Sequence, residues 1–182
     1  MAVAGITESS QYLTFTLDEE LFALEIAKVR EVLEFTTVTK VPRTPEFMRG
    51  VINLRGNVVP VVDLRLKFGM SRTEKCISTC VIIVEVEIDG ESTILGALAD
   101  SVQEVLELEP QQIDPPPRIG TRLDTTFIKG MGKRDDRFII LLNVDRVFTA
   151  EELELVQEAG ELSSARPSRA EAAAVAFVNG AI

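Results

Sequence analysis

Short strand-like segments recur along the chain, and this pattern constrains the fold more than any other feature. In the first of them Leu13, Phe15 and Leu17 alternate with threonine, which places the apolar side chains on one face of a strand. Residues 81–88 form a strongly β-branched run, the composition that strands favour. Many short strands with little helix between them are typical of small β-barrels or of a β-sandwich. We therefore expect a mainly β protein.

Turn-forming residues join the segments into hairpins. In one of these turns Gly56 provides the backbone freedom that a tight connection needs. Proline marks a further loop near residues 110–117, since proline cannot donate a hydrogen bond inside a strand or helix. The predicted hairpin connections are Asp18-Glu19-Glu20, Arg55-Gly56-Asn57, Asp89-Gly90 and residues 133–136.

Helix signals are few. Residues 26–29 suggest a short helical turn, and residues 32–41 return to a strand-like composition. Only one longer helix is expected, because Thr149 and Glu152 have the spacing of a capping box ahead of further apolar residues. The composition then changes, and we expect residues 158–182 to form a disordered or weakly helical tail.

Charge and length exclude several classes of function. A chain of 182 residues suffices for one core or two small subdomains, and its net charge of −10 is unsuited to nucleic acid or an anionic membrane surface. The longest uncharged apolar stretch, about residues 172–182, is shorter than the roughly 18 to 20 residues of a membrane-spanning helix. Residues 1–10 do not resemble a signal peptide, so we expect a flexible N-terminus and a cytoplasmic protein without membrane insertion.

The sequence offers little catalytic chemistry. It contains no histidine, and Cys76 and Cys80 alone cannot complete a tetrahedral zinc site. Gly130-Met131-Gly132-Lys133 is only a fragment of a phosphate-binding loop, because Phe127 and Arg134 occupy positions that the full motif assigns to glycine and to serine or threonine. We expect a binding module without catalytic residues, metal or cofactor. An enzyme based on carboxylates remains an alternative.

Two charged residues interrupt apolar segments. Glu31 lies within Val29-Arg30-Glu31-Val32-Leu33, and Arg55 lies between two apolar strands. Charged side chains that face water at strand ends would explain both residues equally well. A resemblance to a known family decides between these interpretations.

Residues 46–56 (EFMRGVINLRG) and 58–65 (VVPVVDLR) closely resemble the central signature of the CheW family of bacterial chemotaxis coupling proteins. Residues 15–32 are similar to the first strands of that family, and residues 127–143 to its closing hairpin. The resemblance covers about residues 11–157, which we take as one CheW-like domain. It implies two intertwined five-stranded SH3-like β-barrels that share an apolar core, followed by a C-terminal helix.

The resemblance also implies a function. Members of the family are non-catalytic adaptors that couple the cytoplasmic tips of methyl-accepting chemoreceptors to the regulatory domain of the histidine kinase CheA, in arrays at the inner face of the membrane. A coupling role in a non-flagellar pathway, for motility, development or c-di-GMP control, is the alternative. Carried over position by position, the receptor-binding residues implied are Val29, Glu31, Gly50, Arg55, Cys80 and Val81. We further predict that Glu31 and Arg55 form a partly desolvated ion pair that fixes the binding surface.

Overall fold

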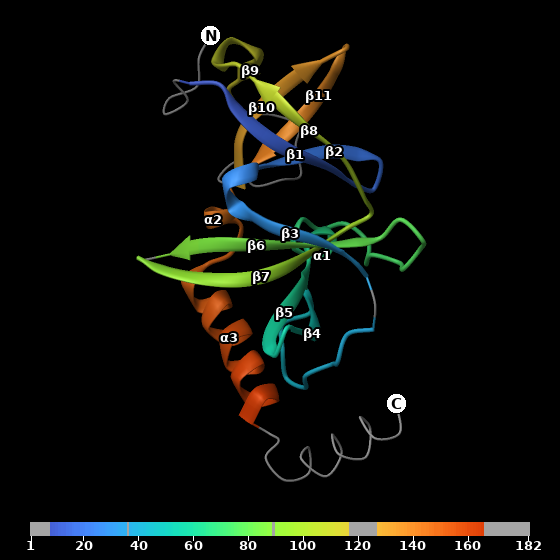
Figure 1. The fold of residues 1–182 in the computed structure, drawn as a ribbon, viewed down its shortest axis with the longest axis vertical. Helices are drawn as coiled ribbons and strands as arrows, with labels where there is room; N and C mark the ends of the chain where they lie inside the picture. The colour runs from blue at the N-terminus through green and yellow to red at the C-terminus, as the bar shows by residue number, and fades with distance from the viewer. Residues whose placement is uncertain (1–7, 36, 89, 117–126, 166–182) are drawn as a thin grey trace.

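The computed structural model describes residues 8–35, 37–88, 90–116 and 127–165 (Figure 1). Its strands form two sheets, which we call sheet A and sheet B. Sheet A has the order β8-β1-β2-β11-β10-β9, with strands β1 (Ser10–Leu17), β2 (Glu20–Glu25), β8 (Ser101–Leu108), β9 (Ile113–Asp114), β10 (Ile128–Arg134) and β11 (Arg137–Leu142). Sheet B has the order β3-β6-β7-β5-β4, with strands β3 (Val29–Glu34), β4 (Met48–Leu54), β5 (Asn57–Asp63), β6 (Cys80–Ile88) and β7 (Glu91–Ala99).

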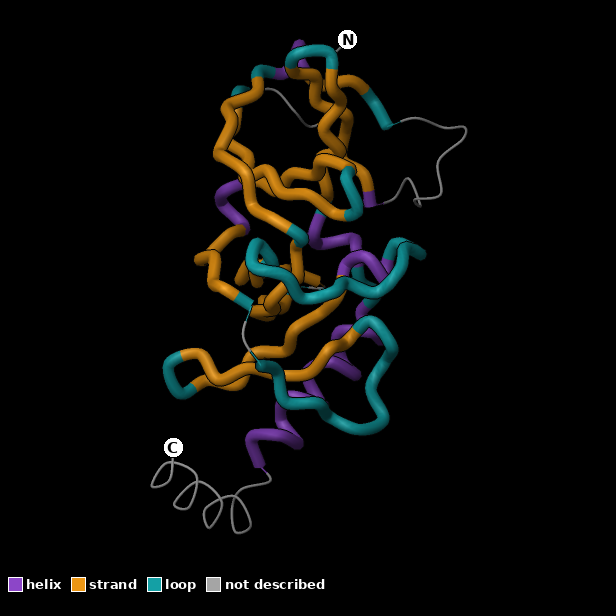
Figure 2. The backbone as a smooth tube through the Cα atoms, turned by 90° about the vertical axis from the view of Figure 1, so that its right-hand side faces the viewer, coloured by secondary structure: helices purple, strands orange, loops and turns teal. Residues whose placement is uncertain are grey.

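The two sheets are intertwined along the chain. The chain begins in sheet A with β1 and β2, forms all of sheet B, and returns to sheet A with β8 to β11. It crosses to sheet B through η1 (Ile26–Lys28), a turn of 3-10 helix, and returns at Asp100. Figure 2 shows the strands of sheet A curled into a ring, and we refer to the two curled sheets as barrel A and barrel B.

Three apolar clusters hold this arrangement together. The interior of barrel A contains Tyr12, Ala23, Leu106, Leu108, Ile113, Ile139 and Leu141. The interior of barrel B contains Phe35, Val59, Val61, Val81, Ile83 and Leu98. A larger cluster is shared by both sheets, and the stacked rings of Phe15, Phe22 and Phe68 run through it with centroids 6.0 and 5.8 Å apart. The shared cluster makes the two barrels one packed unit, as buried apolar area is the main stabilising contribution to folding.

Tight turns connect the strands of three hairpins. Asp18 and Glu19, Arg55 and Gly56, and Asp135 and Asp136 all have positive φ angles, between 48° and 89°. Two consecutive residues with positive φ form the turn whose twist matches that of the flanking strands. These three predicted hairpins are confirmed, although Lys133 and Arg134 belong to β10 and not to the turn. The fourth predicted connection, Asp89-Gly90, includes Asp89, which lies outside the described residues, but the antiparallel pairing of β6 with β7 on either side of it is as expected.

The helices contribute buried side chains to the apolar cluster that both sheets share. Besides α1 (Leu64–Lys67) and α2 (Val144–Val147), the helix α3 (Ala150–Ala165) packs on β5 and β4. The predicted capping box of α3 is confirmed: the Thr149 backbone N–H donates to Glu152 Oε1 at 2.9 Å, and the Glu152 backbone N–H donates to Thr149 Oγ1 at 3.1 Å. Within the described residues, none of the helices combines the length and apolar character needed to cross a membrane.

The predicted fold class is confirmed, with several local differences. Sheet A has a sixth strand, β9, because η2 (Pro110–Gln112) turns the chain back against β10 inside the predicted proline loop. The strand expected at residues 32–41 instead begins at Val29 and ends at Glu34. Helix α3 continues to Ala165, past the expected end of the domain at residue 157. Residues 1–7 and 166–182 lie outside the described part, so the expected flexible N-terminus and tail stay predictions.

Candidate functional site

Arg55 lies at the tip of the hairpin between β4 and β5. Its φ angle is +52° and that of Gly56 is +89°, so the turn reverses the chain within two residues. The side-chain oxygen of Asn53 accepts a hydrogen bond from the Gly56 backbone N–H at 2.8 Å, which stabilises this turn from within the hairpin. The guanidinium of Arg55 is therefore carried by a rigid support, although its side chain is 71% exposed.

The predicted ion pair between Arg55 and Glu31 is confirmed. Arg55 Nη1 donates to Glu31 Oε2 at 2.7 Å and Nη2 donates to Oε1 at 3.0 Å, the two-pronged geometry that is the most specific arginine–carboxylate contact. The hydrogen bond from Arg55 lowers the pKa of Glu31 and raises the pKa of Arg55. The pair is more solvated than we predicted, because only the Glu31 side chain, 26% exposed, is shielded from water.

This ion pair spans the opening of barrel B. Strands β3 and β4 are the two edges of sheet B, and Glu31 belongs to β3 while Arg55 follows β4. In the segment that follows β3, Thr39 exchanges backbone hydrogen bonds of 2.9 and 2.8 Å with Val51 of β4. The bridge and the ion pair together close the barrel where the sheet itself leaves two free edges.

Gly50 makes this closure possible. It is buried, has a φ angle of +145°, and a Cβ atom at this position would lie 2.3 Å from the backbone oxygen of Thr39. A side chain would therefore force the segment after β3 away from β4. In this structure Gly50 belongs to the wall of barrel B and lies behind its surface.

Half-buried apolar side chains pack against the interior of barrel B. Leu33 lies on the same face of β3 as Glu31, and Leu54 precedes Arg55 in the chain. We define the rim of barrel B as the pair Glu31–Arg55 together with the half-buried side chains that pack against the barrel interior. These half-buried side chains are Leu33, Val38, Ile52, Leu54 and Ile94.

The other expected binding residues are divided among three environments. Val81 is 1% exposed and fills the interior of barrel B. Val29 is half-buried against the shared cluster, because a bulge in β3 between Val29 and Glu31 turns these two residues to opposite faces. Cys80 is half-buried at the start of β6, where it pairs with Glu34 and Ala99. The structure thus brings Glu31 and Arg55 together at the rim and keeps the remaining four away from this contact.

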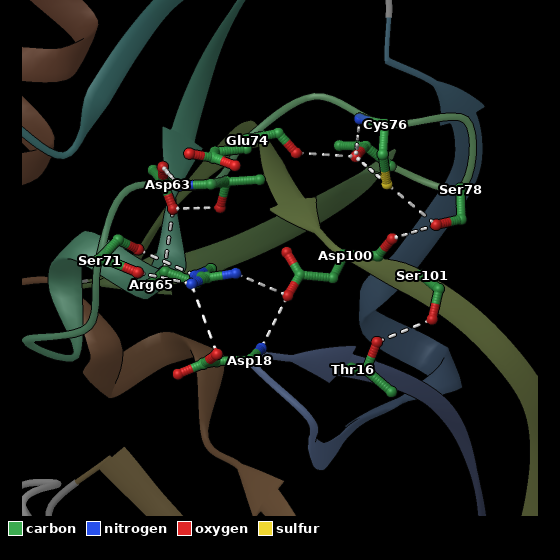
Figure 3. Close-up of polar contacts among 12 residues, drawn as sticks. Thr16, Asp18, Asp63, Arg65, Ser71, Glu74, Cys76, Ser78, Asp100 and Ser101 are labelled. Carbon is green, nitrogen blue, oxygen red and sulfur yellow. Dashed lines mark hydrogen bonds and ion pairs between the residues drawn. The ribbon is translucent and has the colours of Figure 1, made fainter.

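An arginine that we did not single out, Arg65, joins the two barrels (Figure 3). Its Nη1 donates to Asp100 Oδ2 at 2.9 Å, and its Nη2 lies 3.6 Å from Asp18 Oδ1 in the β1–β2 turn. Asp100 Oδ2 also accepts the Asp18 backbone N–H at 2.7 Å. Arg65 further donates to Ser71, and its side chain is only 13% exposed. In the sequence, Arg65 is visible only as a cation at the end of the apolar signature. The fold is needed to show which residues it contacts.

Asp63, two residues before Arg65, is fully buried. Its carboxylate accepts hydrogen bonds from Arg49 Nη1 at 3.2 Å, from the Thr73 backbone N–H and hydroxyl at 2.9 and 2.8 Å, and from the Arg65 backbone N–H at 3.0 Å. Four donors compensate for the loss of water around this charge. The cluster fixes the start of α1 and the loop that follows it.

The cysteines show a contrast in environment. Cys76 is exposed, and hydrogen bonds from Ser78 and Thr79 lower the pKa of its thiol to about 7, while burial raises the pKa of Cys80. In the described part of the chain, no three His, Cys, Asp or Glu side chains gather as a metal ion would require.

The arrangement with the most distinctive geometry is the rim of barrel B, which suits recognition of a partner surface.

Comparison with known proteins identifies the family of this chain. Residues 11–152 match the family model for the CheW-like domain. The chain is 35% identical over 154 residues to a chemotaxis protein CheW of Klebsiella aerogenes, covering 85% of this chain and 90% of the relative. A CheW of Rhizobium meliloti is 33% identical, with coverage of 79% and 90%.

Solved structures agree with the sequence comparison. The crystal structure of the scaffolding protein TtCheW from Thermoanaerobacter tengcongensis superposes with a TM-score of 0.69 and 39% sequence identity. The superposition covers 79% of this chain and 94% of that chain. On the family model, the relatives and the shared fold, this chain belongs to the CheW-like family.

Proposed function

We propose that this chain is a chemotaxis adaptor that couples methyl-accepting chemoreceptors to the regulatory domain of the histidine kinase CheA. The support is membership of a family whose relatives are named chemotaxis proteins and whose structural neighbour is named a scaffolding protein. In this role the protein performs no reaction. It works in the cytoplasm, where receptor arrays hold it at the inner face of the membrane.

The observation that carries the receptor site is the two-pronged Glu31–Arg55 pair at an apolar rim. An arginine has five N–H donors, and Arg55 uses two of them on Glu31. The other three make no hydrogen bond within the described residues, so a partner can accept from them. Half-buried side chains such as Leu33 and Leu54 would contact the apolar face of a receptor helix.

The adaptor role needs several modest contacts acting together. Binding of receptor and kinase to one small protein makes the second contact intramolecular, which raises its effective concentration. The packed cluster shared by the barrels keeps the two binding surfaces in a fixed relation. We therefore propose that the protein positions its partners through a rigid body.

A pull-down with the CheA regulatory domain and a receptor cytoplasmic tip tests the proposal. Wild type should retain both partners, and Arg55→Ala should bind the receptor tip roughly tenfold or more weakly, since exposed arginines are frequent interface hot spots. Arg137→Ala is the matched control, because Arg137 is an exposed arginine on sheet A, in β11. Binding of neither partner by wild type would withdraw the chemotaxis role and favour the coupling of another pathway.

A charge swap distinguishes a direct contact between Arg55 and the receptor from an indirect role of the ion pair in shaping the rim. Glu31→Arg and Arg55→Glu should each weaken receptor binding, because each breaks the pair. The double variant restores an ion pair with the charges exchanged. If the receptor contacts Arg55 directly, the double variant stays weak. If the pair only fixes the rim, binding returns.

A further inference from the structure

Positive charge is concentrated in one part of this acidic chain. Residues 40–75 contain eight lysines and arginines but three aspartates and glutamates, whereas the whole chain has a net charge of −10. This segment begins after β3 and ends before β6. A local excess of one charge on a protein of the opposite charge attracts ligands that the rest of the surface repels.

A cavity of about 230 Å³ lies in this segment. Its lining comes from residues 40–49, from α1 and from the loop that follows α1. The charged lining residues are Lys40, Glu46, Arg49 and Arg72. The remaining lining residues are Val41, Thr44, Pro45, Met48 and Leu66, most of them apolar. The cavity therefore combines cationic groups with an apolar wall.

The cationic groups of the cavity have unused hydrogen-bonding capacity. Lys40 and Arg72 are exposed, and neither forms a hydrogen bond or ion pair with another residue that the structure describes. Arg49 is only 12% exposed, and its Nε is buried without an acceptor in the described part of the chain. A buried donor without an acceptor is rare and destabilising, and the residue that carries it lines the cavity.

The charges in and behind the cavity leave a positive excess. Asp63 neutralises Arg49 from behind, and Glu46 on the lining offsets one of the two remaining cations. Lys40 and Arg72 are thus opposed by a single carboxylate that has no ion-pair partner among the described residues. The excess suits one oxyanion, since charge-assisted hydrogen bonds to oxyanions are the stronger class.

We propose that this cavity binds an oxyanion, a carboxylate or phosphate group, held by Lys40 and Arg72 beside the buried edge of Arg49. An apolar group attached to the oxyanion packs against Met48 and Leu66. The site is separate from the Glu31–Arg55 contact, so it does not depend on the proposed coupling function. The proposal assigns a class of ligand to residues of the sequence signature that do not belong to the rim of barrel B.

Backbone amide chemical shifts of the full chain test the proposal. Inorganic phosphate, acetate and hexanoate are titrated separately, each against sodium chloride at equal ionic strength, because added salt alone screens surface charges. We expect saturable shifts confined to residues around 40–49 and 72. Phosphate binding without acetate binding identifies a phosphate source for the ligand, and the reverse a carboxylate source. Tighter binding of hexanoate than of acetate would mean that the alkyl chain of hexanoate packs against the apolar wall of the cavity.

Variants decide whether the cavity is responsible. The double variant Lys40→Gln/Arg72→Gln changes two exposed side chains and should retain the fold, with roughly tenfold or greater loss of affinity. Arg137→Gln removes an exposed cation from the other sheet and should bind like wild type. Shifts that sodium chloride reproduces, or that persist in the double variant, would overturn the proposal, as would the absence of shifts with all three probes.

Discussion

The rim of barrel B and the junction between the barrels each hold an arginine against carboxylates, but the two arginines differ in exposure. Arg55 is 71% exposed and contacts one carboxylate, whereas Arg65 is 13% exposed and reaches Asp18, Asp100 and Ser71. Water competes for the donors of Arg55 and is largely excluded from those of Arg65. The same chemistry therefore leaves donors open to solvent at the rim and stabilises the fold at the junction.

This comparison predicts that changes near the junction lower stability, while changes at the rim lower binding. The buried end of the series is Asp63, and the exposed end is Arg55. Substitutions at and between these two ends should therefore differ in which property they change.

Asp63→Asn should have the largest effect on stability. The substitution leaves Arg49 without its buried counter-charge and places an amide among four donors. Loss of one member of a buried ion pair typically costs roughly 3–5 kcal/mol. Urea unfolding monitored by circular dichroism measures this loss. Asp135→Asn, at an exposed turn, is the control and should unfold like wild type.

Gly50→Ala should follow, because it opens barrel B. Its methyl group would lie 2.3 Å from Thr39 O, and its backbone has a positive φ. Backbone strain of this kind costs roughly 1–3 kcal/mol, to which the displacement of the Thr39–Val51 bridge adds. Gly56→Ala is the matched control, since Gly56 also has a positive φ but a methyl group there would meet no atom within 4 Å. Equal unfolding free energies of the two variants would contradict the closure argument.

Arg65→Ala should lower the unfolding free energy by roughly 1.5–3 kcal/mol, because it leaves carboxylates at the junction without a charged donor. Arg55→Ala should leave unfolding almost unchanged while it weakens receptor binding. Both variants are measured by urea unfolding and by pull-down. We expect the loss of stability in Arg65→Ala and the loss of receptor binding in Arg55→Ala. The comparison fails if Arg55→Ala destabilises the protein as much as Arg65→Ala does.

Local chemistry made the hairpins predictable. A turn such as Arg55-Gly56 reveals itself within a few residues, and the capping box of α3 needs only Thr149 and Glu152. The Glu31–Arg55 pair could be predicted because the family resemblance drew attention to two opposite charges in apolar segments.

Contacts between segments that are distant in the sequence could not be predicted from local sequence patterns. The Thr39–Val51 bridge joins a loop to a strand edge, and the partners of Arg65 come from both barrels. Neither contact leaves a periodic signal, since each depends on how the sheets close. The resemblance also named Gly50 and Val81 for a binding surface, whereas the fold places both inside the wall or interior of barrel B.

The smallest expected effect concerns the protonation of Glu31. Its hydrogen bond from Arg55 lowers the pKa of Glu31 in the folded protein below the value in the unfolded chain. The stabilisation that the ion pair provides is therefore fully present at pH values above the pKa of Glu31 in the unfolded chain. It is lost as the pH falls through the lowered pKa of Glu31 in the folded protein. In Arg55→Ala, carboxyl NMR titration should show the pKa of Glu31 rising toward its ordinary value. Glu85 is the internal control, because Arg30 lowers its pKa and Arg55 does not, so its titration should stay unchanged. A Glu31 titration that ignores the substitution would mean that the rim pair is absent in solution, and the comparison with the junction would then lose its exposed member.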